Sequence, residues 1–188
     1  MTEEKRQLTS NDRSANSANA NKGRARRGGA RRGQREGGEK ELEQKMLDLS
    51  RVTRVTAGGK RMSFRAAIVV GDRKGHVGFG VAKGADVQIA VEKAYRQAKK
   101  ILVTVPIENG TIPHAVELKF HAAHIILMPA PKGTGLKSGG SVRVILELAG
   151  VPNATSKVLN SSNKINLASA TMEALKKLRP HPQKVAAE

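Results

Sequence analysis

The 188-residue sequence contains no cysteine and no tryptophan, and it has only three phenylalanines and one tyrosine. Without cysteine there are no disulfides and no thiolate metal sites, which fits a reducing compartment. Four aromatic residues are too few for an RNA-recognition motif, which needs two or three exposed rings for stacking besides those in its core. No apolar run approaches the roughly 20 residues that cross a bilayer, and the polar N-terminal stretch predicts no secretory signal.

Acidic residues are also scarce, with 16 against 34 lysines and arginines, so the formal net charge is +18. A field of this sign attracts polyanions, and without a membrane segment the sequence predicts a nucleic-acid partner and no membrane. The remaining candidates for metal ligands are five histidines. No two of them have the i, i+4 spacing that places ligands on one helix face, so neither a metal nor a cofactor is predicted. These histidines are His76, His114, His121, His124 and His181.

Residues 1–40 carry 11 basic and 5 acidic side chains among many Gly, Ser, Asn and Ala residues. Such a composition cannot bury enough apolar surface to offset the cost of ordering, so we expect a disordered tail. Within it, "KGRARRGGARRGQR" (residues 22–35) holds seven cations and no acid. We interpret it as an arm that lies along RNA phosphates and orders on binding, with a solubilising tail as the alternative. The predicted contacts are Arg24, Arg26, Arg27, Arg31 and Arg32.

The spacing of apolar residues predicts a series of strands and helices from residue 39 onward. Asp86 is the expected cap of a helix over residues 87–100, and Asn163 is the expected cap of a helix that starts at residue 163. Gly78 and Gly80 in the third strand would let another backbone approach closely. The expected helices cover residues 39–50, 87–100 and 163–178, and the expected strands cover residues 51–57, 62–70, 76–82, 115–120 and 124–130. The first half therefore reads α-β-β-β-α, the order of a double-stranded-RNA-binding domain.

Basic residues are concentrated in the first three expected strands and the turns between them. Residues 51–83 contain eight lysines and arginines and a single acid, Asp72, whereas an ordinary solvated surface interleaves both signs. No Gly-x4-Gly-Lys-Ser/Thr phosphate loop is present, so the paired glycines at 58 and 59 are expected at a hairpin tip. We predict that this hairpin binds a nucleic-acid backbone. The predicted contacts are Arg51, Arg54, Gly58, Gly59, Lys60, Arg61, Arg65 and Lys83.

A glycine-rich loop, "PKGTGLKSGG" (residues 131–140), precedes a segment of ambiguous structure. Residues 141–150 fit a strand because they are rich in Val and Ile, and they fit a helix because glycines flank them. As a helix, the segment would direct its first N–H groups at an anion. The predicted contacts of this site are Lys132, Gly133, Gly135, Lys137 and Arg143.

The same loop supports an enzyme hypothesis. The pattern Pro-x3-Gly-Leu-x-Ser, from Pro131 to Ser138, resembles the ATP-binding loop of small-molecule kinases of the galactokinase and homoserine kinase type. Such kinases are much longer, and a net charge of +18 serves no purpose for a small substrate. The acids that would hold Mg²⁺ or act as a base are scattered, at Glu117, Glu147 and Glu173. Saturable binding of ATP with Mg²⁺ would distinguish a kinase from an RNA-binding protein.

Five segments together carry a more specific resemblance, which runs in order and with few gaps from about Leu42 to Leu178. They are "RVTAGGKRMSFRAAIVVGDRKGHVGFGVAKGADVQIAVEKA", "NGTIPH", "GTGLKSGG", "LELAGV" and "NKINLASATMEAL". They resemble the family of the bacterial small-subunit ribosomal protein number five, which is universal and also found in organelles.

That resemblance implies an α+β fold in two domains. Residues 41–108 would form a domain like the double-stranded-RNA-binding domain, with the order α-β-β-β-α. Residues 109–180 would form an α/β domain with a left-handed β-α-β crossover, the fold class of the kinases named above. The basic N-terminal tail (residues 1–40) and a short C-terminal tail (residues 181–188) would flank them.

For function, the resemblance implies a non-catalytic structural protein of the small ribosomal subunit in the cytoplasm. Family members bind small-subunit rRNA, help the body and head assemble, and line the path along which mRNA enters. They contact ribosomal proteins number four and number eight of the small subunit, and the contact with number four influences decoding accuracy. The hairpin tip, here residues 58–62, lies near the rRNA pocket of spectinomycin.

Three positions depart from the family pattern. Met62 stands where phenylalanine is common, which suggests softer packing of the hairpin. The stretch from His121 to His124 stands where Gly-Ala-Ser-Lys/Arg is usual, and a neutral histidine holds a phosphate less firmly than a lysine does. Lys164 replaces a common proline and adds a charge at the start of the last helix.

Overall fold

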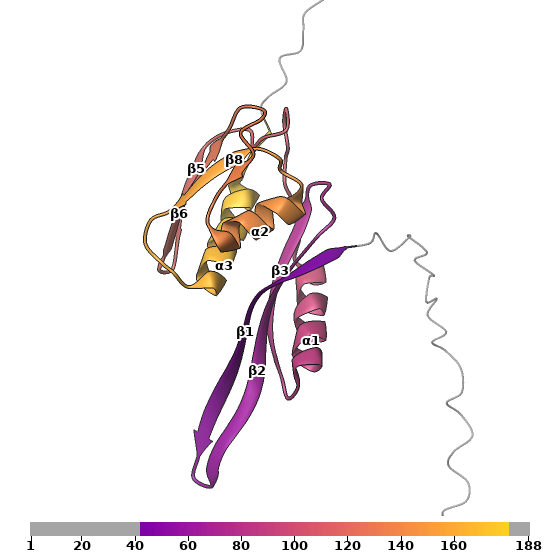
Figure 1. Ribbon diagram of the computed structural model, residues 1–188, viewed down its shortest axis with the longest axis vertical. Helices are drawn as coiled ribbons and strands as arrows, with labels where there is room; N and C mark the ends of the chain where they lie inside the picture. Colours follow the sequence, from indigo (N-terminus) through magenta and orange to yellow (C-terminus); the bar gives the residue numbers. More distant parts are fainter. Residues whose placement is uncertain (1–41, 181–188) are drawn as a thin grey trace, which may run out of the picture. The chain divides into compact units, whose positions relative to one another are not determined.

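The computed structural model describes residues 42–180, so the predicted arginine-rich arm and the C-terminal tail lie outside the described residues. Within residues 42–180 it contains two four-stranded sheets and three helices (Figure 1). The strand order is β1-β2-β3-β4 in the first sheet and β5-β6-β8-β7 in the second. The strands are β1 (Glu43–Thr56), β2 (Gly59–Gly71), β3 (His76–Gly84), β4 (Leu102–Thr104), β5 (Val116–Phe120), β6 (Ala123–Pro129), β7 (Leu136–Lys137) and β8 (Ala154–Val158). The helices are α1 (Val87–Lys100), α2 (Gly140–Ala149) and α3 (Lys164–Lys177).

The helix predicted over residues 39–50 is wrong, because most of this segment belongs to strand β1. β1 pairs with β2 antiparallel along its whole length, with a bulge between Met46 and Asp48. Met46 and Leu49, which would have formed the buried face of a helix, remain 47% and 43% exposed. A helix of this length is marginal on its own, whereas pairing with β2 satisfies the backbone of the segment along the ladder. The described part of the first domain therefore begins β-β-β-α rather than α-β-β-β-α, while the α+β class is confirmed.

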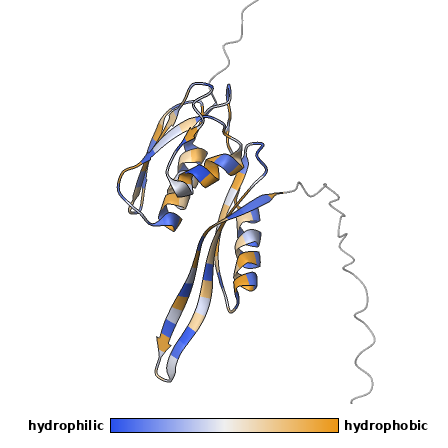
Figure 2. Ribbon diagram, in the orientation of Figure 1, coloured by the Kyte–Doolittle hydropathy of each residue, from blue (hydrophilic) through white to orange (hydrophobic). Residues whose placement is uncertain are grey.

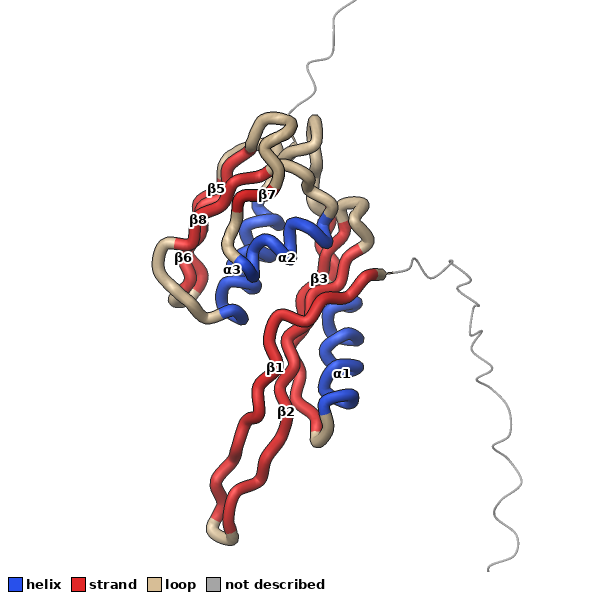
Figure 3. The backbone as a smooth tube through the Cα atoms, in the orientation of Figure 1, coloured by secondary structure: helices blue, strands red, loops and turns tan. Residues whose placement is uncertain are grey.

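Helix α1 packs against the first sheet (Figure 3). Asp86 caps it as predicted, since its Oδ1 accepts a hydrogen bond of 2.7 Å from the N–H of Val87. Its fully buried residues are Ala90, Ala94 and Ala98. A Cβ on Gly78 or Gly80 of β3 would collide with a carbonyl oxygen of α1. The predicted close approach at these glycines is confirmed, and the approaching backbone is that of α1.

The second sheet combines a hairpin with a β-α-β unit. β6 pairs antiparallel with both β5 and β8. The chain then passes from β7 through α2 to β8, and β7 and β8 pair parallel. The ambiguous segment at 141–150 is therefore a helix, which ends at Gly150 in the left-handed conformation with φ 82°. Asn163 caps α3 as predicted, with Oδ1 accepting a hydrogen bond of 3.0 Å from the N–H of Ile165.

The turn between β2 and β3 joins the two sheets through α2. The N–H of Arg73 donates to the carbonyl of Leu148 at 3.0 Å, and the N–H of Gly75 donates to that of Ala149 at 2.9 Å. A Cβ on Gly150 would collide with the backbone of Arg73, so the end of α2 fits tightly against this turn. One hydrophobic core also runs from the first sheet into α2 and the second sheet. The two sheets therefore form a single packed body.

Asp72 organises that turn from a side chain that is only 4% exposed. Its Oδ1 accepts hydrogen bonds from the N–H groups of Lys74 at 2.8 Å and His76 at 3.0 Å, and its Oδ2 lies 2.9 Å from Nδ1 of His76. Burial alone raises the pKa of Asp72. The two N–H groups and the imidazole of His76 outweigh burial, so the pKa lies below its ordinary value of 3.8.

Replacing Asp72 by Asn should therefore destabilise the protein in a pH-dependent way. A carboxylate whose pKa is lower in the folded protein stabilises it above its unfolded pKa, and this contribution disappears as the pH falls through the folded pKa. At neutral pH we expect Asp72→Asn to lower the free energy of unfolding by about 1–2 kcal/mol. Below about pH 4 the difference from the unsubstituted protein should shrink. Urea unfolding across this pH range provides the measurement, and a difference independent of pH would contradict the assignment.

Candidate nucleic-acid interface

Beyond the part of the first sheet that α1 covers, β1 and β2 continue as a ribbon formed by residues 51–64, the hairpin arm (Figure 1). It is two-stranded except at its base, where Phe64 still pairs with β3. Every residue from 53 to 62 is exposed. Figure 2 shows hydrophilic residues on both strands of this arm. An isolated two-stranded ribbon is only marginally stable in water, so the arm is a candidate to gain stability from a partner.

The register of the arm places two arginines face to face. Arg54 on β1 lies directly opposite Arg61 on β2. Like charges in this position destabilise a sheet. Neither guanidinium has an acidic partner within residues 42–180. The protein therefore leaves a repulsive pair on an exposed ribbon, where an external polyanion would relieve the repulsion.

The other face of the arm mixes cations with exposed apolar side chains. Lys60 lies opposite Val55, and Met62 lies opposite Thr53. Val55 is 72% exposed and Met62 is 48% exposed. Arg51 falls on this face as well, because residues two apart on a strand point the same way. The arm thus offers cations for phosphates and apolar groups for the sugar and base surfaces between them.

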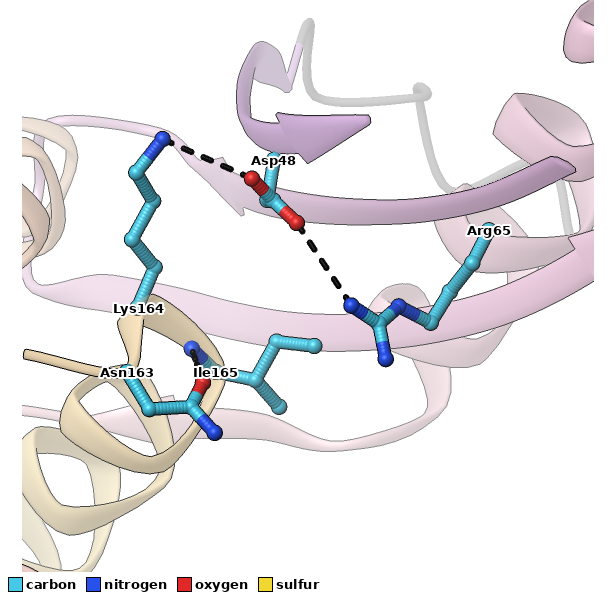
Figure 4. Close-up of polar contacts among 5 residues, drawn as sticks. All are labelled: Asp48, Arg65, Asn163, Lys164 and Ile165. Carbon is cyan, nitrogen blue, oxygen red and sulfur yellow. Dashed lines mark hydrogen bonds and ion pairs between the residues drawn. The ribbon is translucent and has the colours of Figure 1, made fainter. Parts of the chain in front are cut away.

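Arg65 differs from the cations of the arm because it already has an ion-pair partner within the protein. Its Nη2 lies 3.7 Å from Oδ2 of Asp48, whose other oxygen lies 3.4 Å from Nζ of Lys164 (Figure 4). The Nε atom of Arg65 is buried and has no hydrogen-bond partner among the described residues. Lys83 on β3 lies opposite Arg65 on β2 in the strand ladder, and its side chain is exposed. Lys83 is therefore the more accessible of these two predicted contacts.

The loop at residues 131–135 is held in place by Asn153, which the sequence analysis missed. Its Oδ1 accepts hydrogen bonds from the N–H groups of Gly133 at 3.1 Å and Gly135 at 3.0 Å. Its Nδ2 donates to the carbonyl of Gly110 at 3.2 Å, and the residue is only 8% exposed. Gly133 and Gly135 both have left-handed φ angles, 92° and 71°, which favour glycine. Two N–H groups of the predicted anion cradle are therefore directed at Asn153 instead.

The basic side chains of this region remain exposed, namely Lys132, Lys137 and Arg143. Lys137 belongs to β7, and Arg143 lies in the first turn of α2. Gly139, at the N-cap position of α2, provides no side-chain cap for the helix. The free N–H donors of this region thus lie at the start of α2 rather than in the loop.

Five of the predicted RNA contacts belong to the arginine-rich arm and lie outside residues 42–180, as does His181. They are Arg24, Arg26, Arg27, Arg31 and Arg32. Among residues 42–180, no group of three or more histidines, aspartates and glutamates is placed to hold a metal ion. In the same range, no helix has the length and apolarity needed to cross a membrane.

Taken together, these features define a two-domain α+β protein that presents a basic β-hairpin and a basic surface around a β-α-β unit. Two family models match the chain: Ribosomal protein S5, N-terminal domain, over residues 42–106, and Ribosomal protein S5, C-terminal domain, over residues 118–188. The chain belongs to the ribosomal protein S5 family.

Curated relatives agree with this assignment. The small ribosomal subunit protein uS5 of Thermus thermophilus is 51% identical over 136 residues, which cover 72% of this chain and 84% of that protein. The uS5 protein of Hydrogenobaculum sp. is 48% identical over 136 residues, 72% of each chain. That of Thermotoga neapolitana is 46% identical over 143 residues, 76% of this chain and 80% of that protein. The family is structural and non-enzymatic, which rules against the kinase hypothesis.

Proposed function

We propose that this structural component of the small ribosomal subunit binds small-subunit rRNA through the hairpin arm and the surface around the start of α2. The observation that carries the proposal is the opposition of Arg54 and Arg61 on an exposed ribbon without acidic partners in the described part of the chain. An arrangement that costs stability in the free protein becomes favourable when phosphates lie against it. Lys60 and Arg51 supply further cations on the opposite face.

We further propose that this chain has the more specific functions that the family resemblance implies. They are assembly of the body and head in the cytoplasm, contact with mRNA where it enters, and contacts with ribosomal proteins number four and number eight. Decoding accuracy through protein number four and proximity of the arm's tip to the spectinomycin pocket belong with them. The packing of both sheets around α2 supports these roles, because a shared hydrophobic core and the contacts of the β2–β3 turn with α2 join the two sheets. We propose domain limits of 41–108 and 109–180.

The arginine-rich arm at residues 22–35 is expected to add to RNA affinity through charge alone. If all seven of its cations neutralise RNA phosphates, the slope of log affinity against log salt steepens by roughly 5, about 0.7 per contact for single strands. We expect deletion of residues 1–38 to reduce the slope by part of that amount. Binding of bacterial small-subunit rRNA across a salt series measures it. A chain with these seven residues changed to Gln is the matched control, because it keeps the length and removes the charge. Equal slopes for all three proteins would contradict this role.

A further inference from the structure

A groove of about 470 Å³ lies between the start of β1 and helix α1. Leu42, Val91 and Tyr95 line it, and all three are only partly buried. They pack against a small buried core that the first sheet and α1 share. This core consists of Ile68, Val70, Ala94 and Ala98. Apolar surface of the first domain therefore remains accessible in the groove.

The strand beside this groove is an unpaired sheet edge. Among the described residues β1 has β2 as its single neighbour, and no hydrogen bond joins its outer edge to another backbone segment. This edge is long, because β1 spans Glu43–Thr56, whereas the strand at the opposite edge, β4, spans only Leu102–Thr104. An unpaired edge is a template for a further strand. The part that lies beside the groove is the start of β1, before the bulge at Met46.

Helix α1 makes the surroundings of the groove basic. It carries four cations and one acid, Glu92, which pairs with Arg96 at 3.5 Å. Both side chains are more than half exposed, so this ion pair contributes little to stability, and Arg96 can turn to another anion. The other cations of α1 are Lys93, Lys99 and Lys100, all of them exposed. An acidic partner is therefore complementary to this surface.

We propose that the groove and the adjoining edge of β1, together the edge groove, bind an extended acidic peptide segment of another protein. The peptide adds a strand to β1, and its backbone pairs with the outward N–H and C=O groups of that strand. One apolar side chain enters the groove between Leu42, Val91 and Tyr95. Carboxylates two residues before and after it lie on the same face of the added strand, towards the cations of α1. The inference goes beyond the RNA binding proposed above and uses a different part of β1.

A peptide fits this surface better than RNA or a second copy of the chain does. A strand edge alternates N–H donors with C=O acceptors, and another polypeptide in extended conformation carries the matching alternation. RNA phosphates would instead meet the carboxylate of Glu92 and an apolar floor. Two copies of the chain, each with a formal net charge of +18, would repel each other and bring two basic helices together.

Fluorescence anisotropy with the full chain tests the proposal. The probe is a labelled seven-residue peptide with a central valine, aspartates two residues before and after it, and threonine elsewhere. The control peptide has the same side chains but a methyl group on every backbone amide nitrogen, so it keeps the charge and has no N–H to donate. We expect saturable binding of the probe and about tenfold weaker binding of the control. Equal affinities would show that charge alone drives binding, which would overturn the proposal.

Substitutions at Gln44 locate the site. Gln44 lines the groove and is exposed, so Gln44→Glu and Gln44→Lys should both leave the fold intact. We expect Gln44→Glu to bind the probe about fivefold more weakly than Gln44→Lys, because its carboxylate repels the acidic peptide. The same pair of changes at Asn160, an exposed residue after β8, is the matched control and should differ by less than about twofold. An equal difference at both positions would overturn the edge groove as the site.

Three further results would assign the edge groove to another occupant, and each would overturn the proposal. In sedimentation velocity of the chain alone, a dimer that Gln44→Glu dissociates would assign the edge to a second copy, whereas we expect a monomer. In amide NMR, we expect the probe to shift the signals of Gln44 and Tyr95 saturably. Shifts of these signals by a uridine oligonucleotide, with none from the probe, would assign the groove to RNA. Probe binding only after deletion of residues 1–38 would assign it to the chain's own N-terminal segment.

Discussion

Replacing Lys60 and Arg61 together by Glu is expected to lower rRNA affinity about a hundredfold at moderate salt. The two residues follow the tip of the hairpin arm, where every side chain from 53 to 62 is exposed. The change removes two cations and places two carboxylates beside the phosphates. In addition, a carboxylate in place of the Arg61 guanidinium would attract Arg54 across the strands, so the arm itself should form at least as well as before. Relative affinities for different RNA sequences should stay the same, because phosphate contacts carry little sequence information.

The matched control reverses the same amount of charge elsewhere. Lys176 and Lys177 lie in the last turn of α3 and are both exposed. Changing both to Glu alters the net charge equally but leaves the arm intact. Filter binding or fluorescence anisotropy compares the two double variants. We expect the control to lose only a few-fold. Similar losses in both variants would show that overall charge, and not the arm, governs binding.

Gly80→Ala should destabilise the protein by about 3 kcal/mol or more. Gly80 lies on β3 under α1, and a Cβ there would collide with the carbonyl oxygen of Ala94. Because backbone atoms of a helix cannot move aside singly, α1 would have to shift away from the sheet as a unit. The shift would loosen the packing of the buried alanines along α1 against the sheet.

Gly58→Ala is the control for this prediction. Gly58 lies in the turn of the arm, its φ is not left-handed, and a Cβ there meets no atom within 4 Å. We expect a change of no more than about 0.5 kcal/mol. Denaturant unfolding followed by circular dichroism measures both variants. If Gly80→Ala were as mild as Gly58→Ala, the close contact between β3 and α1 would be disproved.

Local signals in the sequence predicted the elements whose hydrogen bonds and apolar faces are local. Asp86 and Asn163 were identified as caps because a cap bonds to N–H groups only one or two residues away. The alternation of residues 62–70 predicted β2, and the glycines of β3 predicted a close backbone approach. The crowding of cations between residues 51 and 83 predicted the basic hairpin.

Features that depend on distant parts of the chain were not predictable in this way. Met46 and Leu49 have helical spacing, but β2 offers the segment a full ladder of hydrogen bonds, which no periodicity reveals. Asn153 orders a loop about twenty residues earlier in the chain. In each case the fold brings together groups that the sequence keeps apart.

This chain belongs to a family of small ribosomal subunit proteins, and we propose that it holds rRNA with the hairpin arm. Cross-linking of protein to RNA in small subunits isolated from cells, followed by mass spectrometry of the cross-linked peptides, tests it most directly. We expect the chain to sediment with the small subunit and rRNA cross-links to occur on peptides that contain Lys60 and Arg61. Sedimentation with the small subunit but cross-links confined to other surfaces, with the arm unmodified, would contradict it.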